Sequence, residues 1–259
     1  MAVRVVALGS GSHGNATLVE FGATRVLVEA GLSARTLAKR LESIGVAPGS
    51  LTAVLVSHEH QDHASGAERF SKVFGVPLVC TVETLEALDL SPIHVAEWIP
   101  LEPGSLLDLA GVEVDAFPVP HDAARPVGFC VHGEGVRVGI VTDLGHATTL
   151  VVERLRGCHV LMVEANHDDR MLQGGPYPWH LKQRIGGRMG HLSNEEAALL
   201  IERVAEPECR AVILTHLSEK NNTPALARDA AARALQRAGQ RRVEMRVAAA
   251  TRPSPAVVL

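Results

Sequence analysis

Short apolar runs, rich in valine and bounded by Gly, Pro or Asp, recur along this chain and limit its fold more than any other feature of the sequence. Runs of this length and composition are typical of β-strands, because β-branched side chains pack well on a pleated surface. The predicted strands include residues 3–8, 25–29, 53–57, 112–119, 127–132, 136–142, 159–164 and 211–216. We therefore expect these runs to form β-strands.

Helical patterns lie between these runs and carry capping signals. Ser33 and Gly45 bracket one pattern, and Ser193 followed by Glu196 forms the signature of a capping box. Pro224 suits the first turn of another helix. The predicted helices are residues 34–44, 67–74, 82–88, 197–204 and 224–238. Because strands dominate the first half and strand and helix alternate in the second, we predict an α/β fold with two sheets flanked by helices.

Size and composition bound the class of protein. The chain has 259 residues, of which 46% are hydrophobic and 21% charged, and this suffices for one sizeable core. No repeat or linker divides it, so we expect a single domain over residues 1–259. The net charge of -4 excludes a uniformly basic nucleic-acid-binding protein. The aromatic content of 3% disfavours the base-stacking sheets of RNA-binding domains.

Cysteine usage and hydropathy indicate the compartment. The four cysteines stand apart, without a C-x-x-C pair, so neither a disulfide framework nor a zinc ribbon is expected. No apolar stretch reaches the roughly 18 residues that a membrane span needs. Residues 1–8 are expected to form a strand rather than a signal peptide. We therefore expect a cytoplasmic protein that makes no contact with a membrane.

Two segments are expected to lack regular structure. Residues 166–190 are rich in Gly and Pro, and a loop this long in a compact domain is usually functional or disordered. This segment is also the most basic stretch of the chain, so we predict a basic loop at the active site. Residues 252–259 contain Pro253 and Pro255 and are expected to be frayed.

A cluster of metal-ligand residues, His58-x-His60-x-Asp62-His63, directly follows the predicted strand 53–57. Imidazole nitrogens and a carboxylate suit zinc, manganese or iron. The end of a strand places His58 and His60 on one side, and the turn that follows can bring Asp62 and His63 to a neighbouring point. The alternative is a surface patch of histidines. Four ligand-type residues within six positions, straight after a buried strand, favour two adjacent metal ions instead.

Three more candidate ligands stand at the ends of predicted strands: His121, Asp143 and His216. Each alone could simply close a turn. Together they complete two coordination spheres, with Asp143 placed to bridge them. We therefore predict a centre of two divalent metal ions, Zn²⁺ or Mn²⁺.

This arrangement of ligands, from the H-x-H-x-D-H cluster to Asp143 in T-D-L-G and His216 in L-T-H-L-S, resembles that of the metallo-β-lactamase superfamily along nearly the whole chain. The resemblance implies a four-layer αβ/βα sandwich, with two mixed sheets flanked by helices and the site at their shared edge. It also implies three sets of ligands: His58, His60 and His121 for one metal, Asp62, His63 and His216 for the other, and Asp143 as the bridge.

Within the superfamily, the finer similarity is to YycJ/WalJ-type nucleases. The motifs that carry it are residues 9–15, 121–123, 126–129, 164–168, 190–194 and 216–222. The last of these also resemble the signature of the tRNA 3′-processing endonuclease RNase Z, in which a strand-end Glu pairs with a His before the final ligand. The sequence lacks an obvious exosite arm, and residues 143–216 leave no room for a β-CASP insertion. The resemblance implies a nuclease that acts on DNA, from the 5′ ends of a duplex.

Three residues are candidates for the chemistry. Two metal ions lower the pKa of water and clamp a phosphate on its attacking and leaving sides. Asp62 can hold or deprotonate that water. His191 is the candidate that protonates the leaving oxygen or binds the phosphate, with Glu164 orienting it. The alternative for His191 is a plain residue at a helix entry, ahead of the Ser193 cap.

Substrate contacts are expected from two segments. The glycine-rich residues 9–15 can contact phosphate or simply form a tight turn, since they lack the Lys of a P-loop. The residues predicted to touch the substrate are Ser12, Asn15, His167, His180, Lys182, Arg184 and Arg188.

Three functions are compatible with the sequence. The first is a DNA nuclease in DNA repair, acting as a 5′→3′ exonuclease, with or without endonuclease activity. The other two are an RNA-processing endonuclease of the RNase Z type and a hydrolase of small thioesters, lactams or lactones. The basic segment and the Glu164–His191 pair favour a phosphodiester, with DNA as the expected partner and RNA as the alternative.

Overall fold

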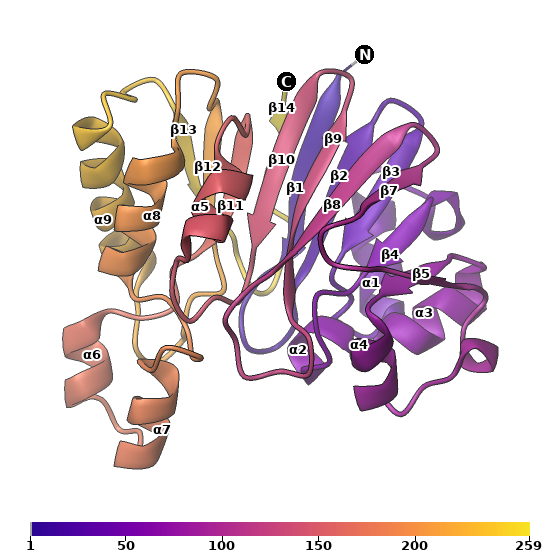
Figure 1. Cartoon of the computed structure of the whole chain (residues 1–259), viewed down its shortest axis with the longest axis horizontal. Coiled ribbons are helices and arrows are strands. Elements are labelled where there is room, and N and C mark those ends of the chain that lie inside the picture. The colour runs from indigo at the N-terminus through magenta and orange to yellow at the C-terminus, as the bar shows by residue number, and fades with distance from the viewer. Residues whose placement is uncertain (1) are drawn as a thin grey trace.

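The computed structural model describes residues 2–259. Two seven-stranded sheets face each other, and helices cover the outer face of each, so the layers run helix, sheet, sheet, helix (Figure 1). The fold class predicted from the sequence is confirmed. Within residues 2–259, no helix combines the length and the apolar character needed to cross a bilayer.

The first sheet has the strand order β14-β1-β2-β3-β4-β5-β6. Its first three strands along the chain pair antiparallel, whereas β3 to β6 run parallel to one another. Its strands are β1 (Val3–Gly9), β2 (Ala16–Phe21), β3 (Thr24–Val28), β4 (Ala53–Leu55), β5 (Leu78–Cys80), β6 (Trp98–Pro100) and β14 (Val257–Val258). The outer face is covered by α1 (Ala34–Ser43), α3 (Ala67–Phe74) and α4 (Val82–Ala87).

The second sheet has the order β13-β12-β11-β10-β9-β8-β7 and is also mixed, with parallel pairing from β10 to β13. Its strands are β7 (Leu106–Leu109), β8 (Val112–Pro118), β9 (Val127–Gly133), β10 (Val136–Val141), β11 (Val160–Glu164), β12 (Ala211–Thr215) and β13 (Glu244–Val247). It is covered by α5 (Thr149–Leu155), α8 (Asn194–Val204) and α9 (Pro224–Arg237). The remaining helices are α2 (Gln61–Ala64), α6 (Asp169–Gly174), α7 (Trp179–Ile185) and two 3₁₀ turns, Pro48–Ser50 and Pro92–His94.

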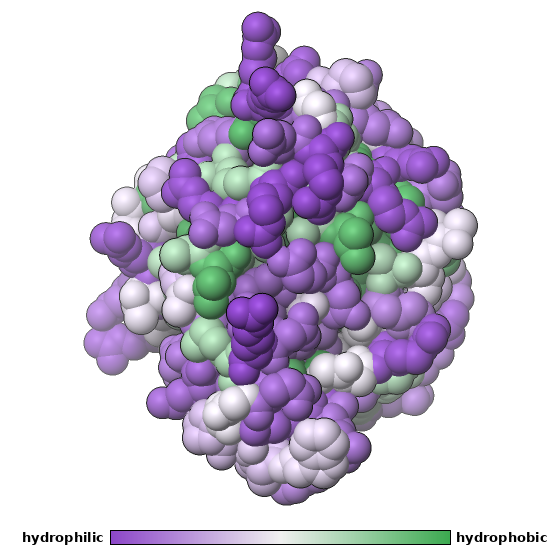
Figure 2. Space-filling model, turned by 90° about the vertical axis from the view of Figure 1, so that its left-hand side faces the viewer, coloured by the Kyte–Doolittle hydropathy of each residue, from purple (hydrophilic) through white to green (hydrophobic). Residues whose placement is uncertain are grey.

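The valine-rich runs are explained by burial on both faces of each sheet. In β11, Val160 and Met162 face the other sheet, whereas Leu161 and Val163 face the helices. Side chains alternate between faces along a strand, so a strand in the middle of a four-layer sandwich is apolar throughout. The far side of α8 and α9 is largely hydrophilic, with small separate apolar patches (Figure 2).

The capping signals are confirmed. Ser33 accepts a hydrogen bond from the amide of Thr36 at the start of α1. Ser193 and Glu196 form the predicted capping box of α8. The strands β5 and β6 have three residues each, which is too short for a pattern to stand out in the sequence.

The expectation of a structureless loop over residues 166–190 is wrong. Two short helices form here, α6 and α7, and they project below the sheets beside the site (Figure 1). The side chain of Asp168 caps α6 by accepting from the amide of Met171, and Pro178 precedes the first turn of α7. Glycine and proline punctuate the ends of these helices rather than preventing them.

The expectation of a frayed tail over residues 252–259 is also wrong. β14 extends the first sheet by pairing antiparallel with β1, and Val257 is buried between the sheets. The Ser254 amide donates to the carbonyl of Ala7, and the Ser254 hydroxyl accepts from the Ala7 amide. The tail is ordered because the edge of β1 supplies backbone partners.

Candidate metal centre

The predicted ligands meet at one edge of the molecule, where strands of both facing sheets end. His58 and His60 follow β4, His121 follows β8, Asp143 follows β10, and His216 follows β12. Four loops, widely separated in sequence, therefore deliver their side chains to one place. This is the strand-end edge at which open α/β sheets carry their sites.

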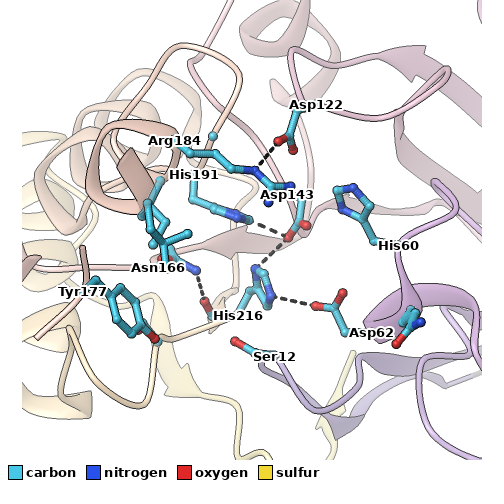
Figure 3. Close-up of a pocket in the computed structure, with 15 residues that line it drawn as sticks. Ser12, His60, Asp62, Asp122, Asp143, Asn166, Tyr177, Arg184, His191 and His216 are labelled. Carbon is cyan, nitrogen blue, oxygen red and sulfur yellow. Dashed lines mark hydrogen bonds and ion pairs between the residues drawn. The ribbon is translucent and has the colours of Figure 1, made fainter. Parts of the chain in front are cut away.

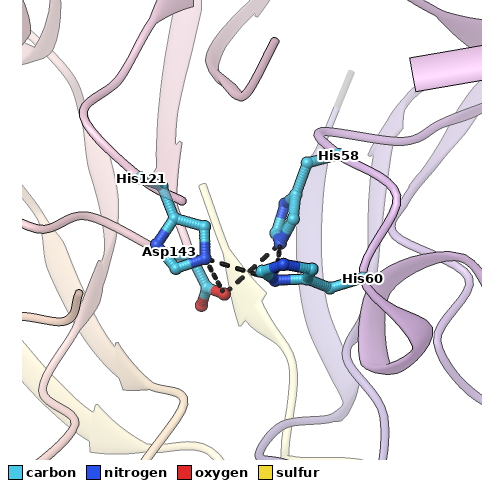
Figure 4. A group of neighbouring side chains, drawn as sticks. All are labelled: His58, His60, His121 and Asp143. Atoms are coloured by element: carbon cyan, nitrogen blue, oxygen red, sulfur yellow. Dashed lines mark hydrogen bonds and ion pairs between the residues drawn. The ribbon is translucent and has the colours of Figure 1, made fainter. Parts of the chain in front are cut away.

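The first group consists of His58, His60, His121 and Asp143 (Figure 4). The Nδ1 atom of His60 lies 3.0 Å from Nε2 of His58 and 3.3 Å from Nε2 of His121. Oδ2 of Asp143 lies 3.5 Å from Nε2 of His58 and 3.3 Å from Nε2 of His121. The four ligand atoms thus enclose a small common space.

The second group consists of Asp62, His63 and His216. Oδ2 of Asp62 lies 3.1 Å from Nε2 of His216 and 3.5 Å from Nε2 of His63. Oδ2 of Asp143 lies 3.3 Å from Nε2 of His63. Because this oxygen also belongs to the first group, Asp143 stands between the two, as a bridging ligand would.

The spacing of these atoms fits metal ions. Ligands at about 2.0–2.1 Å from a tetrahedral zinc ion lie about 3.3 Å from one another. Burial, and then the neighbouring His63, lower the pKa of His58 to about 4. Burial also lowers the pKa of His121. The lowered pKa favours the neutral form of both rings, and this is the form in which a histidine nitrogen binds a metal ion.

The ring nitrogens that point away from the ligand space are anchored. Nδ1 of His58 lies 2.8 Å from the hydroxyl of Ser57, and Nδ1 of His121 lies 2.9 Å from the carbonyl of Gly190. Such outer hydrogen bonds select the tautomer and the orientation of a ligating histidine.

Residues 24–217 match the sequence profile of the beta-lactamase superfamily domain. The chain belongs to this superfamily. Within the superfamily it is similar to exodeoxyribonuclease YycJ of Bacillus anthracis, with 31% identity over 92% of this chain and 91% of the relative. It is also similar to exodeoxyribonuclease WalJ of Streptococcus pneumoniae, with 32% identity over 85% of this chain and 83% of the relative.

The metallo-beta-lactamase fold protein YhfI of Bacillus subtilis has the same fold, with a TM-score of 0.77, 16% identity and complete coverage of both chains. The resemblance inferred from the motifs is thus confirmed. As a member of this superfamily, the chain is a metal-dependent hydrolase.

Glu164 is fully buried at the end of β11 and holds two histidines of the superfamily site together. Its Oε1 lies 2.7 Å from Nδ1 of His191 and 2.9 Å from Nδ1 of His216. Its Oε2 accepts from the amides of Leu144 and Leu192. Both oxygens are thus used, so Glu164 positions its neighbours and does not face the substrate.

His191 is the partner that reaches the pocket, with 20% of its side chain exposed. Burial opposes the charged forms of His191 and Glu164, but their mutual attraction and hydrogen bond outweigh it. The pKa of His191 is therefore raised and that of Glu164 is lowered. With Nδ1 bound to Glu164, the opposite nitrogen is left for the pocket. The ring of His191 lies there beside Asp143 (Figure 3). The sequence prediction placed both residues here without showing that Glu164 also orients His216.

Asp62 stands at the pocket as well. Burial raises its pKa, but hydrogen bonds from His216 and His63 outweigh burial and hold the pKa well below its usual value. The side chain is 22% exposed, so an ionised carboxylate faces the open space.

The substrate-contact residues predicted from the sequence separate into two groups. Ser12 and Arg184 line the pocket beside the metal-facing side chains. Arg184 donates through Nε to Oδ2 of Asp122 at 2.6 Å and so reaches across to the loop that carries His121.

The others lie elsewhere. The side chain of Asn15 is buried. Its Oδ1 accepts a hydrogen bond from the backbone amide of Gly11, and its Nδ2 lies 3.1 Å from Nε2 of His63. His167 is buried beside Ser193, and burial lowers its pKa. His180, Lys182 and Arg188 lie outside the pocket lining. His180 is exposed, Lys182 donates a hydrogen bond to the carbonyl of Gln173, and Arg188 is hydrogen-bonded to His146.

Glu29 is a site residue that the sequence analysis missed. It is buried at the end of β3, where its Oε1 lies 3.4 Å from Nδ1 of His63. It also accepts hydrogen bonds from the amide of Ser57 and the hydroxyl of Thr142. The available signal was an acidic residue ending an apolar strand just before Gly31. A Cβ on Gly31 would lie 1.7 Å from the carbonyl oxygen of Asp62, so only glycine fits there.

The backbone conformation of His216 is a second feature that the sequence analysis did not predict. His216 has a φ of 53°, in the left-handed region that non-glycine residues rarely adopt. Its amide donates to the hydroxyl of Ser10 at 2.7 Å, and its carbonyl accepts from the Asn166 amide at 3.0 Å. These two contacts stabilise a conformation that turns the ring towards Asp62.

Proposed function

We propose that this chain is a two-metal phosphodiesterase that digests DNA from 5′ ends, as a 5′→3′ exonuclease with endonuclease activity as a second mode, in the cytoplasm and in DNA repair. The observation that carries the proposal is the Glu164–His191 pair, in which the carboxylate raises the pKa of a histidine at the pocket, 3.9 Å from Asp143. Hydrolysis of an acyl bond does not require a separate histidine directed at a phosphate. The two relatives named exodeoxyribonucleases support the choice of DNA.

Seven side chains would hold two divalent ions, zinc or manganese, in the groups already described. His58, His60 and His121 would hold one ion, Asp62, His63 and His216 the other, and Asp143 both. When bound, such a pair of ions supplies a water of lowered pKa and neutralises the charge of the phosphate.

The protein's own groups divide the work at the water and at the leaving oxygen. Asp62 is open to the pocket, and its lowered pKa keeps it ionised but makes it a weak base, so it orients the attacking water by accepting a hydrogen bond. His191 carries a proton and donates it to the leaving oxygen, while Glu164 keeps the ring in place.

The proposal is tested by incubating the wild-type protein, loaded with zinc or with manganese, with 5′- and 3′-labelled duplex DNA, single-stranded DNA, a precursor tRNA and a thioester. We expect mononucleotides released from the 5′ end of the duplex, with binding that weakens steeply as salt rises, because phosphate contacts release counterions. Asp62→Ala should abolish the activity. The matched control, Asp229→Ala on the exposed side of α9, should leave it unchanged.

The same assay also tests the two alternative functions, RNA processing and hydrolysis of a small thioester. Cleavage of the precursor tRNA with no action on DNA would favour an RNA-processing endonuclease. Thioester turnover by a protein that leaves every nucleic acid intact would contradict the phosphodiesterase proposal.

A further inference from the structure

One wall of the pocket differs in chemistry from the rest. Asp62, Asp143, His191 and other ionisable or polar groups form most of the lining, whereas the remaining side is formed by Tyr177, just ahead of α7, and by Leu181 and Ile185 of α7. Leu181 and Ile185 are four residues apart and therefore share one face of the helix. Tyr177 lies across the pocket from His60 and Asp62 (Figure 3).

The aromatic ring in this wall stands out against the rest of the chain. Tyr177 is the single tyrosine, and only two tryptophans and five phenylalanines accompany it. Four of the phenylalanines, Phe21, Phe70, Phe117 and Phe129, are buried in the core. Tyr177 is thus the aromatic side chain that faces the open space beside the metal-facing residues.

One end of the wall is tied to the segment that carries His191, and the backbone at the other end is restricted by two prolines. Pro176 and Pro178 flank Tyr177 and restrict its backbone. At the far end of α7, the carbonyl of Ile185 accepts a hydrogen bond of 2.8 Å from the amide of His191. A Cβ on Gly190 would lie 2.2 Å from that same carbonyl oxygen, so the two segments are in direct backbone contact.

We propose that Tyr177, Leu181 and Ile185 form the subsite for the nucleoside attached to the scissile phosphate. This inference rests on the proposed phosphodiesterase function. A phosphate held by the metal-facing residues must extend into its nucleoside, and the wall opposite offers an aromatic face for it. A tyrosine ring stacks on any base, because every base has a π-face, so the subsite reads no sequence.

The size of the pocket limits what enters. Its volume is about 330 Å³, at the lower end of the range for ligand pockets. Such a volume matches one nucleotide, and we expect the terminal nucleotide to enter unpaired and to stack on Tyr177.

Two esters that differ only in the nucleoside test the subsite: thymidine 5′-(p-nitrophenyl phosphate) and methyl p-nitrophenyl phosphate. In the wild type, the ratio of kcat/KM should favour the nucleoside ester. Tyr177→Ala should lower this ratio about tenfold or more, since a stacked base contributes on that order. Tyr177→Phe keeps the ring and should keep the ratio. The methyl ester reports in each variant whether the metal centre is intact.

Trp179→Ala is the matched control, because Trp179 is an aromatic residue two positions after Tyr177 that is 64% exposed and does not line the pocket. It should leave the ratio at the wild-type value. An unchanged ratio in Tyr177→Ala, or an equal fall in Trp179→Ala, would overturn the subsite while leaving the phosphodiesterase intact. A wild type that cleaves neither ester but turns over a thioester would overturn both proposals.

Discussion

Glu29 illustrates how a single buried residue can position a candidate metal ligand from behind. Its carboxylate touches His63 on the side away from the ligand space and is fixed there by Ser57 and Thr142. Carboxylates in this position orient the ring of a ligating histidine and raise its basicity. The residue thus acts through His63 and is a positioning residue rather than a catalytic one.

Glu29→Gln should weaken the binding of one metal ion of the two. We expect a loss of affinity of about 10–100-fold, because the amide cannot strengthen the imidazole as a carboxylate does. The measurement is the number of ions retained per chain during titration with a chelator. Glu113→Gln, at an exposed position of β8, is the control and should retain both ions. Equal retention by the two variants would show that Glu29 has no influence on the centre.

His191 allows a test that separates an acid from a structural residue. His191→Ala should lower kcat on DNA by about 10²–10⁴-fold, the usual contribution of a positioned acid. On bis(p-nitrophenyl) phosphate the loss should be much smaller, because p-nitrophenolate leaves without a proton. Metal content should stay the same. His132→Ala, whose side chain is 48% exposed on β9, is the control. A similar loss on both substrates would exclude the role as an acid.

At the scale of the element, α6 and α7 account for the error over residues 166–190. Their glycines and prolines indicated an irregular loop, yet Asp168 and Pro178 begin short helices there. Helices of six and seven residues are too short to show a clear apolar period. Packing against the loops that carry His191 and Asn221 stabilises them, and this contact lies outside any local pattern.

The ion pair between Arg184 of α7 and Asp122 gives a prediction for the element. Both side chains are largely open to solvent, at 61% and 32% exposure, so Arg184→Ala should change the free energy of unfolding by less than about 1 kcal/mol. If Arg184 contacts phosphate, its loss should reduce the salt dependence of DNA binding by about one counterion. Binding measured over a series of salt concentrations gives this slope. Arg233→Ala, in an ion pair between α8 and α9, should leave the slope unchanged.

At the scale of the whole molecule, the last strand ties the end of the chain to its beginning. β14 covers the edge of β1, and Val257 enters the core between the sheets while Val258 is 60% exposed. The error about this tail arose because the partner of the strand lies some 250 residues away in the sequence.

Neighbouring valines of β14 provide a matched pair of variants. Val257→Ala should lower the free energy of unfolding by about 2 kcal/mol, because it removes two buried methyl groups and leaves a cavity. Val258→Ala should change it by less than about 0.5 kcal/mol. Urea denaturation of both variants measures the difference. Equal stability of the two would mean that the tail contributes nothing to the core.

The sequence by itself determined everything that depends on near neighbours along the chain. The capping box at Ser193, the strand ahead of His58 and the spacing of the H-x-H-x-D-H cluster are all set within a few residues, and side-chain periodicity and backbone geometry act at that range. The motifs were also sufficient to identify the superfamily, and with it the candidate ligands on distant strands, which the structure brings together.

Only the tertiary structure decided which side chains support that centre. Glu29 meets His63 because β3 and β4 pair in parallel, and Tyr177 meets the pocket because α7 packs against the loop of His191. Strand pairing and helix docking depend on the free energy of burying the whole core, to which a lone acid or tyrosine contributes almost nothing. The sequence around such a residue therefore does not say which side chains it meets across space.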